Sequence, residues 1–415
     1  MKQNPMIIVG AGHAGCSAAR TLRARGWAGP IELVNSEAEI PYERPPVSKS
    51  ILAGERSPSD LPLFNAAWLA GNELTYRPSI EVTSLSLPTR RIHLSDGCAL
   101  QYEKLLLATG SSARRLDVPG SDLDNVHYLR SAADAEGFRR RLGPAARLVI
   151  VGGGLIGLEV AATASKLGCS VTIVETGPQL LGRALAPEIE RMVRAMHQAA
   201  GVQIRLGETI AAMQGHGSVS TVVLGSGESI DCDVVLVSIG GRPRTELAEQ
   251  AGLTVSNGIV TDQYLRSSDD HVFAAGDVSF FPDRYTGTRT RLESWKNAED
   301  QGECAAINML GGQAVHQTVP WMWSDQFDKV IQIAGHPAPG VPSVVRPLSE
   351  TSAMAFQLGE DGRISSVCGF GDIALVGRNV RIGQSMVERG VHIDPVSLAN
   401  PTVELKSFLR ATATT

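Results

Sequence analysis

The sequence has no C-x-x-C pair and no group of cysteines with the spacing of metal ligands. Its six cysteines lie far apart, at positions 16, 98, 169, 232, 304 and 368. This pattern predicts buried free thiols in a reducing compartment, with neither a disulfide framework nor a bound metal.

Long hydrophobic runs are also missing. No stretch reaches the roughly 18 uninterrupted apolar residues of a membrane-spanning helix, because glycines and Glu159 interrupt the nearest candidate, 148–164. The apolar start at 6–9 runs straight into Gly10 and has no signal-peptide cleavage pattern. The formal net charge of −5 gives no general attraction for nucleic acid. We therefore expect a cytoplasmic protein with neither a membrane nor a nucleic acid as its partner.

What the chain does have is length, glycine and a globular composition. Its 415 residues, 43% apolar and 20% charged, predict roughly two to four folded domains. Glycine occurs 43 times without a collagen-like period. Where these glycines lie carries most of the information.

An internal near-repeat organises the chain. Residues 6–15 read MIIVGAGHAG and residues 148–157 read LVIVGGGLIG. Each is an apolar β-type run followed by G-x-G-x-x-G, then by a helix-type segment and a second apolar run, at 31–34 and 171–174. Two nucleotide-binding βαβ units are predicted.

Each repeat is followed by an acidic residue and later by a further apolar run that ends in a glycine turn. The runs are 105–110 and 234–240, and the acids are Glu37 and Glu175. Such acids accept hydrogen bonds from adenosine ribose hydroxyls, and a carboxylate at Glu175 would repel a 2′-phosphate, which favours NADH over NADPH. Ser36 and Glu39 remain alternatives to Glu37.

The rest of the chain has a different texture. Residues 91–97 alternate as an antiparallel ribbon does, and 270–279, DHVFAAGDVS, is an apolar strand that closes on Asp277. From about residue 316 prolines separate short strand-like runs, which indicates a further α+β domain.

In a chain with two predicted dinucleotide folds, the segment DHVFAAGDVS resembles the flavin-binding signature of two-dinucleotide flavoprotein reductases. The segments at 41–52, 291–302 and 320–328 (PYERPPVSKSIL, RLESWKNAEDQG and PWMWSDQFD) are similar to those of the FAD-dependent ferredoxin reductases of oxygenase systems. The resemblance covers essentially the whole chain and is closest to reductase components of aromatic-ring dioxygenases. Putidaredoxin and rubredoxin reductases and apoptosis-inducing factor are similar but more distant.

The resemblance implies a glutathione-reductase-like α/β fold with two Rossmann-like domains and a C-terminal α+β domain. The expected boundaries are 1–108 with 241–315 for FAD, 109–240 for NADH and 316–415 for the C-terminal domain.

The resemblance also implies an FAD site. Lys49 would approach the flavin as a cation that stabilises negative charge on the reduced ring. Arg44 would approach the flavin as well, Pro45 would pack on the ring, Glu37 would contact the ribose and Val82 the adenine side. The remaining expected FAD residues are Gly10, Gly12, Ala14, Gly15, Ala108, Thr109, Gly110, Arg130, Asp277 and Trp295.

On the nicotinamide side, the resemblance implies contacts from a second set of residues. Glu159, taken to lie in the first turn of the second glycine-loop helix, either complements the helix dipole or contacts the nicotinamide carboxamide. Arg183 would touch the adenosine or merely cover surface. The other expected NADH residues are Gly152, Gly154, Ile156, Gly157, Glu175 and Gly240, with Gly241 nearby.

One departure from the family pattern is visible. The family usually has a Pro-Asn pair after Ile-Gly, whereas here SIGGRPRT places Arg244 after Pro243. A hydrogen bond that the family assigns to the asparagine is therefore in doubt. The fold and the cofactors are not affected.

The expected activity is transfer of electrons from NADH through FAD to a [2Fe-2S] ferredoxin that feeds a Rieske-type dioxygenase. No cysteine lies between Asn35 and Asn65, so an internal thiol relay is not expected, and Cys16 is interpreted as packing. Trp295 favours this partner. Trp321 and Trp323 also lie close to flavin-type motifs, although large aromatic residues usually belong to a core or an interface. Basic docking candidates are Arg284, Arg289 and Arg291, and the run Arg139, Arg140 and Arg141.

Other acceptors stay open at this point. They are the ferredoxin of a haem-thiolate monooxygenase, rubredoxin, dioxygen, a quinone and monodehydroascorbate. A redox-sensing interaction protein like apoptosis-inducing factor is a further alternative, against which the short termini and acidic balance argue.

Overall fold

The computed structural model describes residues 3–182 and 184–411. The chain forms two compact units, both discontinuous in sequence. The first comprises residues 1–45, 56–112 and 241–318, and the second comprises 46–55, 113–240 and 319–415. The chain passes between them after residues 45, 55, 112, 240 and 318; the crossing after 112 lies within β8 (Ser111–Ala113) and that after 240 directly precedes β17 (Gly241–Pro243). The division of the second unit into a nucleotide-binding and a C-terminal domain stays a prediction.

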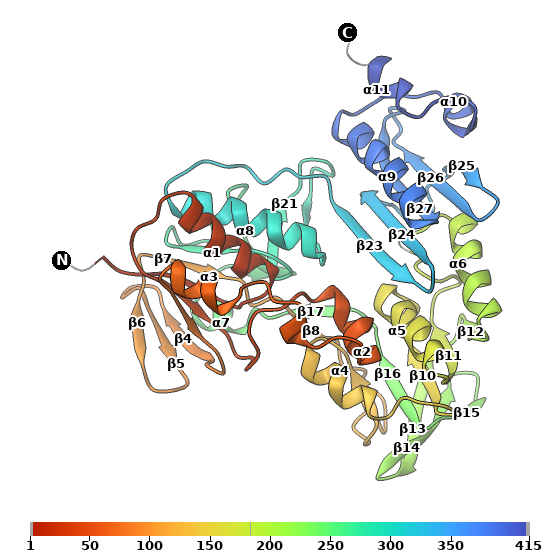
Figure 1. The fold of residues 1–415 in the computed structure, drawn as a ribbon, viewed down its shortest axis with the longest axis horizontal. Coiled ribbons are helices and arrows are strands. Elements are labelled where there is room, and N and C mark those ends of the chain that lie inside the picture. The colour runs from red at the N-terminus through yellow and green to blue at the C-terminus, as the bar shows by residue number, and fades with distance from the viewer. Residues whose placement is uncertain (1–2, 183, 412–415) are drawn as a thin grey trace. The chain divides into compact units, whose positions relative to one another are not determined.

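A five-stranded parallel sheet forms the centre of the first unit (Figure 1). In spatial order its strands are β20 (Val272–Ala274), β7 (Lys104–Leu107), β1 (Met6–Val9), β2 (Ile31–Val34) and β3 (Leu74–Arg77). Val9 lies in register with Val34 on one side and Leu107 on the other. All four residues of β1 are buried, as expected of a parallel strand covered on both faces.

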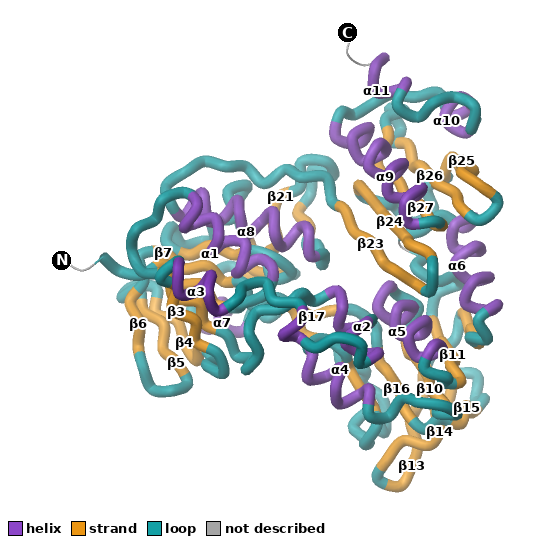
Figure 2. The backbone as a smooth tube through the Cα atoms, viewed as in Figure 1, coloured by secondary structure: helices purple, strands orange, loops and turns teal. Residues whose placement is uncertain are grey.

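The side chains of β1 alternate between two cores. Met6 and Ile8 face the layer formed by α1 (His13–Ala24) and α8 (Trp295–Met309), which run side by side (Figure 2). Ile7 and Val9 belong to the other core, which also contains residues of an antiparallel meander. The meander strands are β4 (Val82–Ser86), β5 (Arg91–Leu94) and β6 (Ala99–Gln101). The predicted ribbon at 91–97 is confirmed.

Short elements complete the first unit. They are a 3₁₀ turn (Pro58–Asp60), α3 (Ala66–Gly71), α7 (Glu246–Gln250), β18 (Val255–Ser256), β19 (Gly258–Val260), β21 (Ser279–Pro282) and β22 (Arg289–Thr290). A further 3₁₀ turn, Pro45–Ser48, begins at the edge of this unit.

The second unit repeats the same sheet plan. In spatial order the strands are β12 (Gln203–Leu206), β11 (Ser170–Glu175), β10 (Arg147–Val151), β16 (Val234–Val237) and β9 (Val126–Tyr128). Val151 lies in register with Val174 and with Val237, as Val9 does with its two neighbours. The predicted duplication of strand, glycine turn, helix and strand is confirmed.

The layers repeat as well. One core of this sheet includes residues of an antiparallel ribbon, made of β13 (Ile210–His216), β14 (Ser218–Leu224) and β15 (Ser229–Asp231). The helices of this part are α2 (Ser50–Ala53), α4 (Ala132–Arg139), α5 (Leu155–Lys166) and α6 (Pro187–Ala199).

The C-terminal part of the second unit is an antiparallel sheet with helices, so the predicted α+β class is confirmed. Its strands, in spatial order, are β23 (Trp321–Gln326), β24 (Lys329–Gly335), β27 (Ile364–Gly371), β26 (Ser352–Leu358) and β25 (Ser343–Ser349). The helices are α9 (Ile373–Glu388), α10 (Pro395–Ala399) and α11 (Ser407–Ala411). Helix α9, which was not predicted from the sequence, packs on β24 and β27. Among the described residues, no helix has the length and apolarity needed to cross a bilayer.

Candidate dinucleotide sites

The first glycine loop connects β1 to α1 and leaves an open cradle. Gly10 has a φ of +105°, and a Cβ there would lie 2.2 Å from the carbonyl oxygen of Ala108. A Cβ on Gly15 would lie 2.0 Å from the carbonyl oxygen of Gly10. At Gly12, by contrast, a Cβ would have no atom within 4 Å. Gly10 and Gly15 are therefore needed for packing, while Gly12 keeps space open at the loop.

The open space lies at the N-terminus of a helix. Gly12 is the N-cap of α1 and has no side chain with which to cap it. The first-turn N–H groups, including that of Ala14, have no intrahelical acceptor and can bind a phosphate. His13 is committed elsewhere, since its Nε2 accepts the backbone N–H of Arg44 at 3.2 Å.

The second loop, between β10 and α5, has equivalent geometry. Gly152 has a φ of +110°, and a Cβ there would lie 2.3 Å from the Ser238 carbonyl oxygen. A Cβ on Gly157 would lie 2.4 Å from the Gly152 carbonyl oxygen, and one on Gly154 would have no atom within 4 Å. Gly154 is the N-cap of α5. The chain thus contains two cradles that a pyrophosphate fits.

Glu175 ends β11 directly beside the second cradle. Its carboxylate accepts the N–H of Gly153 at 2.7 Å and that of Gly177 at 2.7 Å. These two bonds hold an acid at the edge of the loop, where a ribose diol can be bound.

The residue equivalent to Glu175 in the first cradle is Asn35, which the sequence analysis missed. Asn35 follows β2 as Glu175 closes β11, and its Oδ1 accepts the N–H of Ala11 at 3.4 Å. The signal was its position directly after the second apolar run, 31–34, since Glu175 directly follows the corresponding run, 171–174. Asn35 is not an acid, and Glu37, two residues later, was predicted instead.

Glu37 lies in a compact polar cluster. Arg44 donates from Nη2 to Oε1 at 2.5 Å and from Nη1 to Oε2 at 3.1 Å, and the Tyr42 hydroxyl donates to Oε2 at 2.8 Å. Burial alone would raise the pKa of Glu37, but the hydrogen bonds and charge of Arg44, with the Tyr42 hydroxyl, bring it below its ordinary value. Arg44 is therefore held beside Glu37, and its predicted approach to the flavin stays a prediction.

Asp277 follows β20 in the first unit and is only 9% exposed. Its Oδ2 accepts the Ser111 hydroxyl at 2.9 Å. Beside it, Gln301 of α8 accepts the N–H of Gly276 through Oε1 at 2.8 Å. Its buried Nε2 donor has no hydrogen-bond partner among the described residues. A buried carboxylate and a buried N–H donor at this loop could form hydrogen bonds with the hydroxyl groups of the ribityl chain of a flavin.

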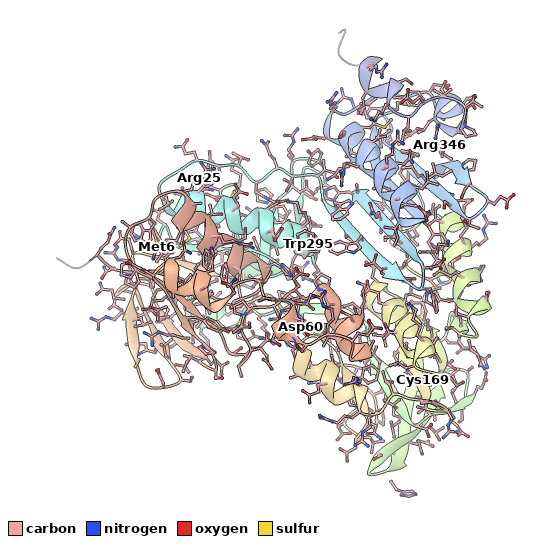
Figure 3. All side chains as sticks on the ribbon, viewed as in Figure 1. Met6, Arg25, Asp60, Cys169, Trp295 and Arg346 are labelled. Atoms are coloured by element: carbon pink, nitrogen blue, oxygen red, sulfur yellow. The ribbon has the colours of Figure 1, made fainter. Side chains whose placement is uncertain are left out.

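Two further predicted FAD residues lie on described elements of the same unit. Trp295 is the first residue of α8 and is labelled in Figure 3, and its ring centroid lies 5.9 Å from that of His13. Thr109 donates to the backbone oxygen of Arg244 at 2.8 Å, while the Arg244 N–H donates to Gly110 at 3.0 Å. The backbone of Arg244 thus fixes the 109–110 turn without the family's asparagine.

Lys49 and Glu159, two predicted site residues that are far apart in sequence, lie in contact in the second unit. Lys49 Nζ lies 2.9 Å from Glu159 Oε1 and 4.0 Å from Asp325 Oδ2. Glu159, only 6% exposed, also accepts hydrogen bonds from the hydroxyls of Ser48 and Ser324.

The placement of Glu159 in the first helical turn was wrong. α5 begins at Leu155, so Glu159 is its fifth residue and the first turn contains no acid. The helix dipole acts mainly within the first turn. The carboxylate is balanced by the Lys49 ammonium and two hydroxyls instead.

The roles of the remaining predicted residues stay predictions. Ile156 is 44% exposed on α5, the Arg130 N–H donates to Asp134, and Val82 opens β4. Pro45 begins a 3₁₀ turn and Gly240 has a φ of +102°. Arg183 lies outside the described residues.

All six cysteines are described and all are free. Cys16 on α1 is fully buried, and burial raises its pKa to about 12. Such a thiol is not a nucleophile at neutral pH, which agrees with its interpretation as packing.

Several of the arginines proposed for docking are already engaged within their own unit. Arg291 pairs with Glu293, Arg284 donates to Gln317 at 2.8 Å, and Arg289 donates to backbone carbonyls. Arg140 pairs with Glu136. Their part in docking stays a prediction.

Comparison with known sequences gives two family matches. Residues 4–302 match the pyridine nucleotide-disulphide oxidoreductase family, and residues 321–409 match the family described as Reductase C-terminal.

The chain is 37% identical over 410 residues to the anthranilate 1,2-dioxygenase system ferredoxin–NAD(+) reductase component of Burkholderia cepacia, covering 99% of this chain and 100% of that protein. It is 40% identical over 331 residues to a rubredoxin–NAD(+) reductase of Pseudomonas putida, covering 80% and 86%. Among solved structures it is similar to a chain of the covalent putidaredoxin reductase–putidaredoxin complex, with a TM-score of 0.93, 33% identity and 100% of both chains covered.

Proposed function

The chain belongs to the pyridine nucleotide-disulphide oxidoreductase family, among its ferredoxin–NAD(+) reductases, and from this membership we propose that it transfers electrons from NADH to a [2Fe-2S] ferredoxin that feeds a Rieske-type dioxygenase. The observation that carries the proposal is the pair of equivalent open cradles, at Gly12 and at Gly154, in one chain. The family implies FAD and NAD(P) as the two dinucleotides.

The first cradle fits FAD. The N–H groups at the start of α1 bind the pyrophosphate, Asn35 and Glu37 stand at the ribose side, and Asp277 with Gln301 provides buried polar groups for the rest of the cofactor. When bound, FAD supplies the chemistry of accepting two electrons from a nicotinamide and releasing them one at a time.

The second cradle fits NADH. The start of α5 binds the pyrophosphate, and Glu175 receives the ribose hydroxyls while its charge repels a 2′-phosphate. Glu159 accepts a hydrogen bond from the nicotinamide carboxamide, and Lys49 balances its charge.

The electron acceptor is external. Disulphide reductases of this family need a redox-active cysteine pair, whereas the six cysteines of this chain lie far apart in sequence and none lies between Asn35 and Asn65. Relatives that use ferredoxin and relatives that use rubredoxin both resemble the chain at similar identity. The dioxygenase ferredoxin is preferred because the relative named for a dioxygenase system matches along the full length. The free thiols support a cytoplasmic location.

The test is anaerobic reduction of the FAD-loaded protein by NADH, followed by mixing with a panel of acceptors. The panel holds a [2Fe-2S] ferredoxin of a Rieske dioxygenase, one of a haem-thiolate monooxygenase, a rubredoxin, a quinone, monodehydroascorbate and dioxygen. The proposal expects the Rieske-system ferredoxin to reoxidise the protein fastest. Faster turnover with any other acceptor would reassign the partner, and no turnover with any two-iron ferredoxin would defeat the proposal.

A further inference from the structure

Strand β23 carries two different faces. Trp321 and Trp323 stack on one face with ring centroids 5.3 Å apart. Ser324 and Gln326 alternate onto the opposite face, where they are 0% and 1% exposed. Two polar side chains this deeply buried need hydrogen-bond partners, and the partners they have lead to Glu159.

A chain of side-chain hydrogen bonds runs from α6 through β23 to α5. His197 Nε2 lies 2.9 Å from Gln326 Oε1, and Gln326 Nε2 donates to Ser324 Oγ at 3.1 Å. Ser324 Oγ in turn donates to Glu159 Oε1 at 2.7 Å. His197 is 0% exposed, Ser324 and Gln326 are 0% and 1% exposed, and Glu159 is 6% exposed, so these hydrogen bonds are shielded from water.

The hydrogen bonds of this chain point in one direction. An amide oxygen only accepts, so His197 Nε2 carries the proton that meets Gln326 Oε1. The Gln326 amide nitrogen then occupies one lone pair of Ser324, which leaves the single hydroxyl proton of Ser324 for Glu159. If the amide were reversed, its oxygen would compete with Glu159 for that proton.

The reversed orientation of the Gln326 amide would require the His197 proton to lie on Nδ1, and this arrangement is disfavoured. The Nδ1 of His197 has no hydrogen-bond partner among the described residues. A buried ring nitrogen without a partner costs less as an acceptor than as an N–H donor, which keeps the proton on Nε2. Burial also lowers the pKa of His197, opposed only by the Gln326 hydrogen bond, so the ring is neutral at pH 7.

The consequence appears at Glu159. A carboxylate has about four acceptor positions. Among the described residues, Lys49, Ser48 and Ser324 occupy three of them. The remaining position suits one N–H donor, such as a carboxamide.

We propose that Gln326, supported by His197, is a positioning residue for nicotinamide binding: it commits the Ser324 hydroxyl to Glu159 and so fixes the carboxylate with one acceptor position left for the carboxamide. This inference rests on the proposed role of Glu159 in the function above. Gln326 itself acts through Ser324.

The test is a double-mutant cycle read out by NAD+ affinity, measured by titration calorimetry on the FAD-loaded protein. Gln326→Leu is expected to raise the Kd for NAD+ about tenfold, and Ser324→Ala to do the same. In the Glu159→Gln background, Gln326→Leu should add little, because its route of action is already removed. His197→Gln, which keeps an N–H donor, should bind NAD+ more tightly than His197→Leu.

Gln384→Leu is the matched control. Gln384 lies on α9 in the same part of the chain, and its amide donates to the Val319 carbonyl oxygen at 3.4 Å. Its removal should leave NAD+ affinity unchanged. Melting temperatures of all variants show whether each is folded. If Gln326→Leu is not folded, Ser324→Ala is used for the test instead.

The outcomes separate this inference from the proposed function. If the parent protein binds no NAD+, the proposed function fails. If the parent binds NAD+ but Glu159→Gln does not weaken it, the role of Glu159 fails and this inference fails with it. If Glu159→Gln weakens binding while Gln326→Leu behaves like Gln384→Leu, or adds its full effect to Glu159→Gln, only the inference is overturned.

Discussion

The two cradles differ in the side chain that accepts a hydrogen bond from a backbone N–H of the glycine loop. Glu175 offers a carboxylate to Gly153, whereas Asn35 offers a neutral amide to Ala11. A carboxylate beside a ribose repels a 2′-phosphate, and an amide does not. We therefore propose that Glu175 determines the choice between NADH and NADPH.

Glu175→Gln tests this assignment. The substitution removes the charge and keeps an oxygen that can accept the Gly153 N–H. The ratio of kcat/KM for NADH to that for NADPH is expected to fall about tenfold or more. Glu136→Gln, which removes an exposed acid of the same unit, should leave the ratio unchanged. A ratio that does not move in Glu175→Gln would contradict the assignment.

The ion pair of Glu37 and Arg44 predicts an acid-sensitive contribution to stability. The pKa of Glu37 is lowered below the ordinary value of 4.5, so the contribution is complete above pH 4.5 and is lost as the pH falls through the folded-state pKa. Arg44→Met should lower the melting temperature at pH 7, by the equivalent of about 1–2 kcal/mol. It should also flatten the fall in melting temperature between pH 5 and pH 3.

Arg191→Met is the control for that prediction. Arg191 pairs with Glu188 at an exposed site, where an ion pair contributes little. The melting temperature of this variant should follow that of the parent at every pH. If Arg44→Met kept the full acid sensitivity of the parent, Glu37 would not be its source.

At the scale of the element, the geometry of each strand–loop–helix unit predicts that substitutions in the two glycine loops affect the binding of different dinucleotides. Gly12→Ala and Gly154→Ala place a methyl group in open space, and both backbones are in regions that alanine adopts. Each variant should fold with an unchanged apoprotein melting temperature. Gly12→Ala should lose FAD affinity and Gly154→Ala should lose NAD+ affinity, each by tenfold or more in titration.

Gly10→Ala provides the contrast. Its methyl group would meet the Ala108 carbonyl oxygen and would need a positive φ, so this variant should lose stability before any ligand is added. If Gly12→Ala bound FAD as tightly as the parent, the first cradle would not be a pyrophosphate site.

The sequence could predict these elements because their signals are local. A β-type run, the glycine spacing and the following helix lie within about a dozen residues, so the βαβ units and their two glycine loops were predicted correctly. Their role as dinucleotide sites stays a prediction. To predict the position of Asn35, the register of the strands must be known. To predict that of Glu159, the residue at which α5 begins must be known. The network of His197, Gln326 and Ser324 could not be predicted, since its members come from α6 and β23 and meet only through tertiary packing.

At the scale of the whole molecule, the chain contains two folded units with separate nucleotide-binding sheets. Units with their own cores can unfold in separate transitions. A ligand stabilises only the unit that binds it, by about 2.7 kcal/mol at a hundredfold excess over Kd. In calorimetry of the apoprotein, FAD should raise mainly the transition of the first unit, which contains the first cradle, and NAD+ that of the second. In the Gly12→Ala variant the shift caused by FAD should shrink, and a shift as large as that of the parent would contradict this account.

The central claim is that one chain holds FAD and its nicotinamide donor in paired cradles. The most direct measurement is anaerobic titration of the purified, FAD-reconstituted protein with NADH while the flavin absorbance is followed. The account predicts one FAD per chain and complete bleaching by one equivalent of NADH. A protein that stays colourless after reconstitution, or a yellow protein that NADH does not bleach, would contradict it.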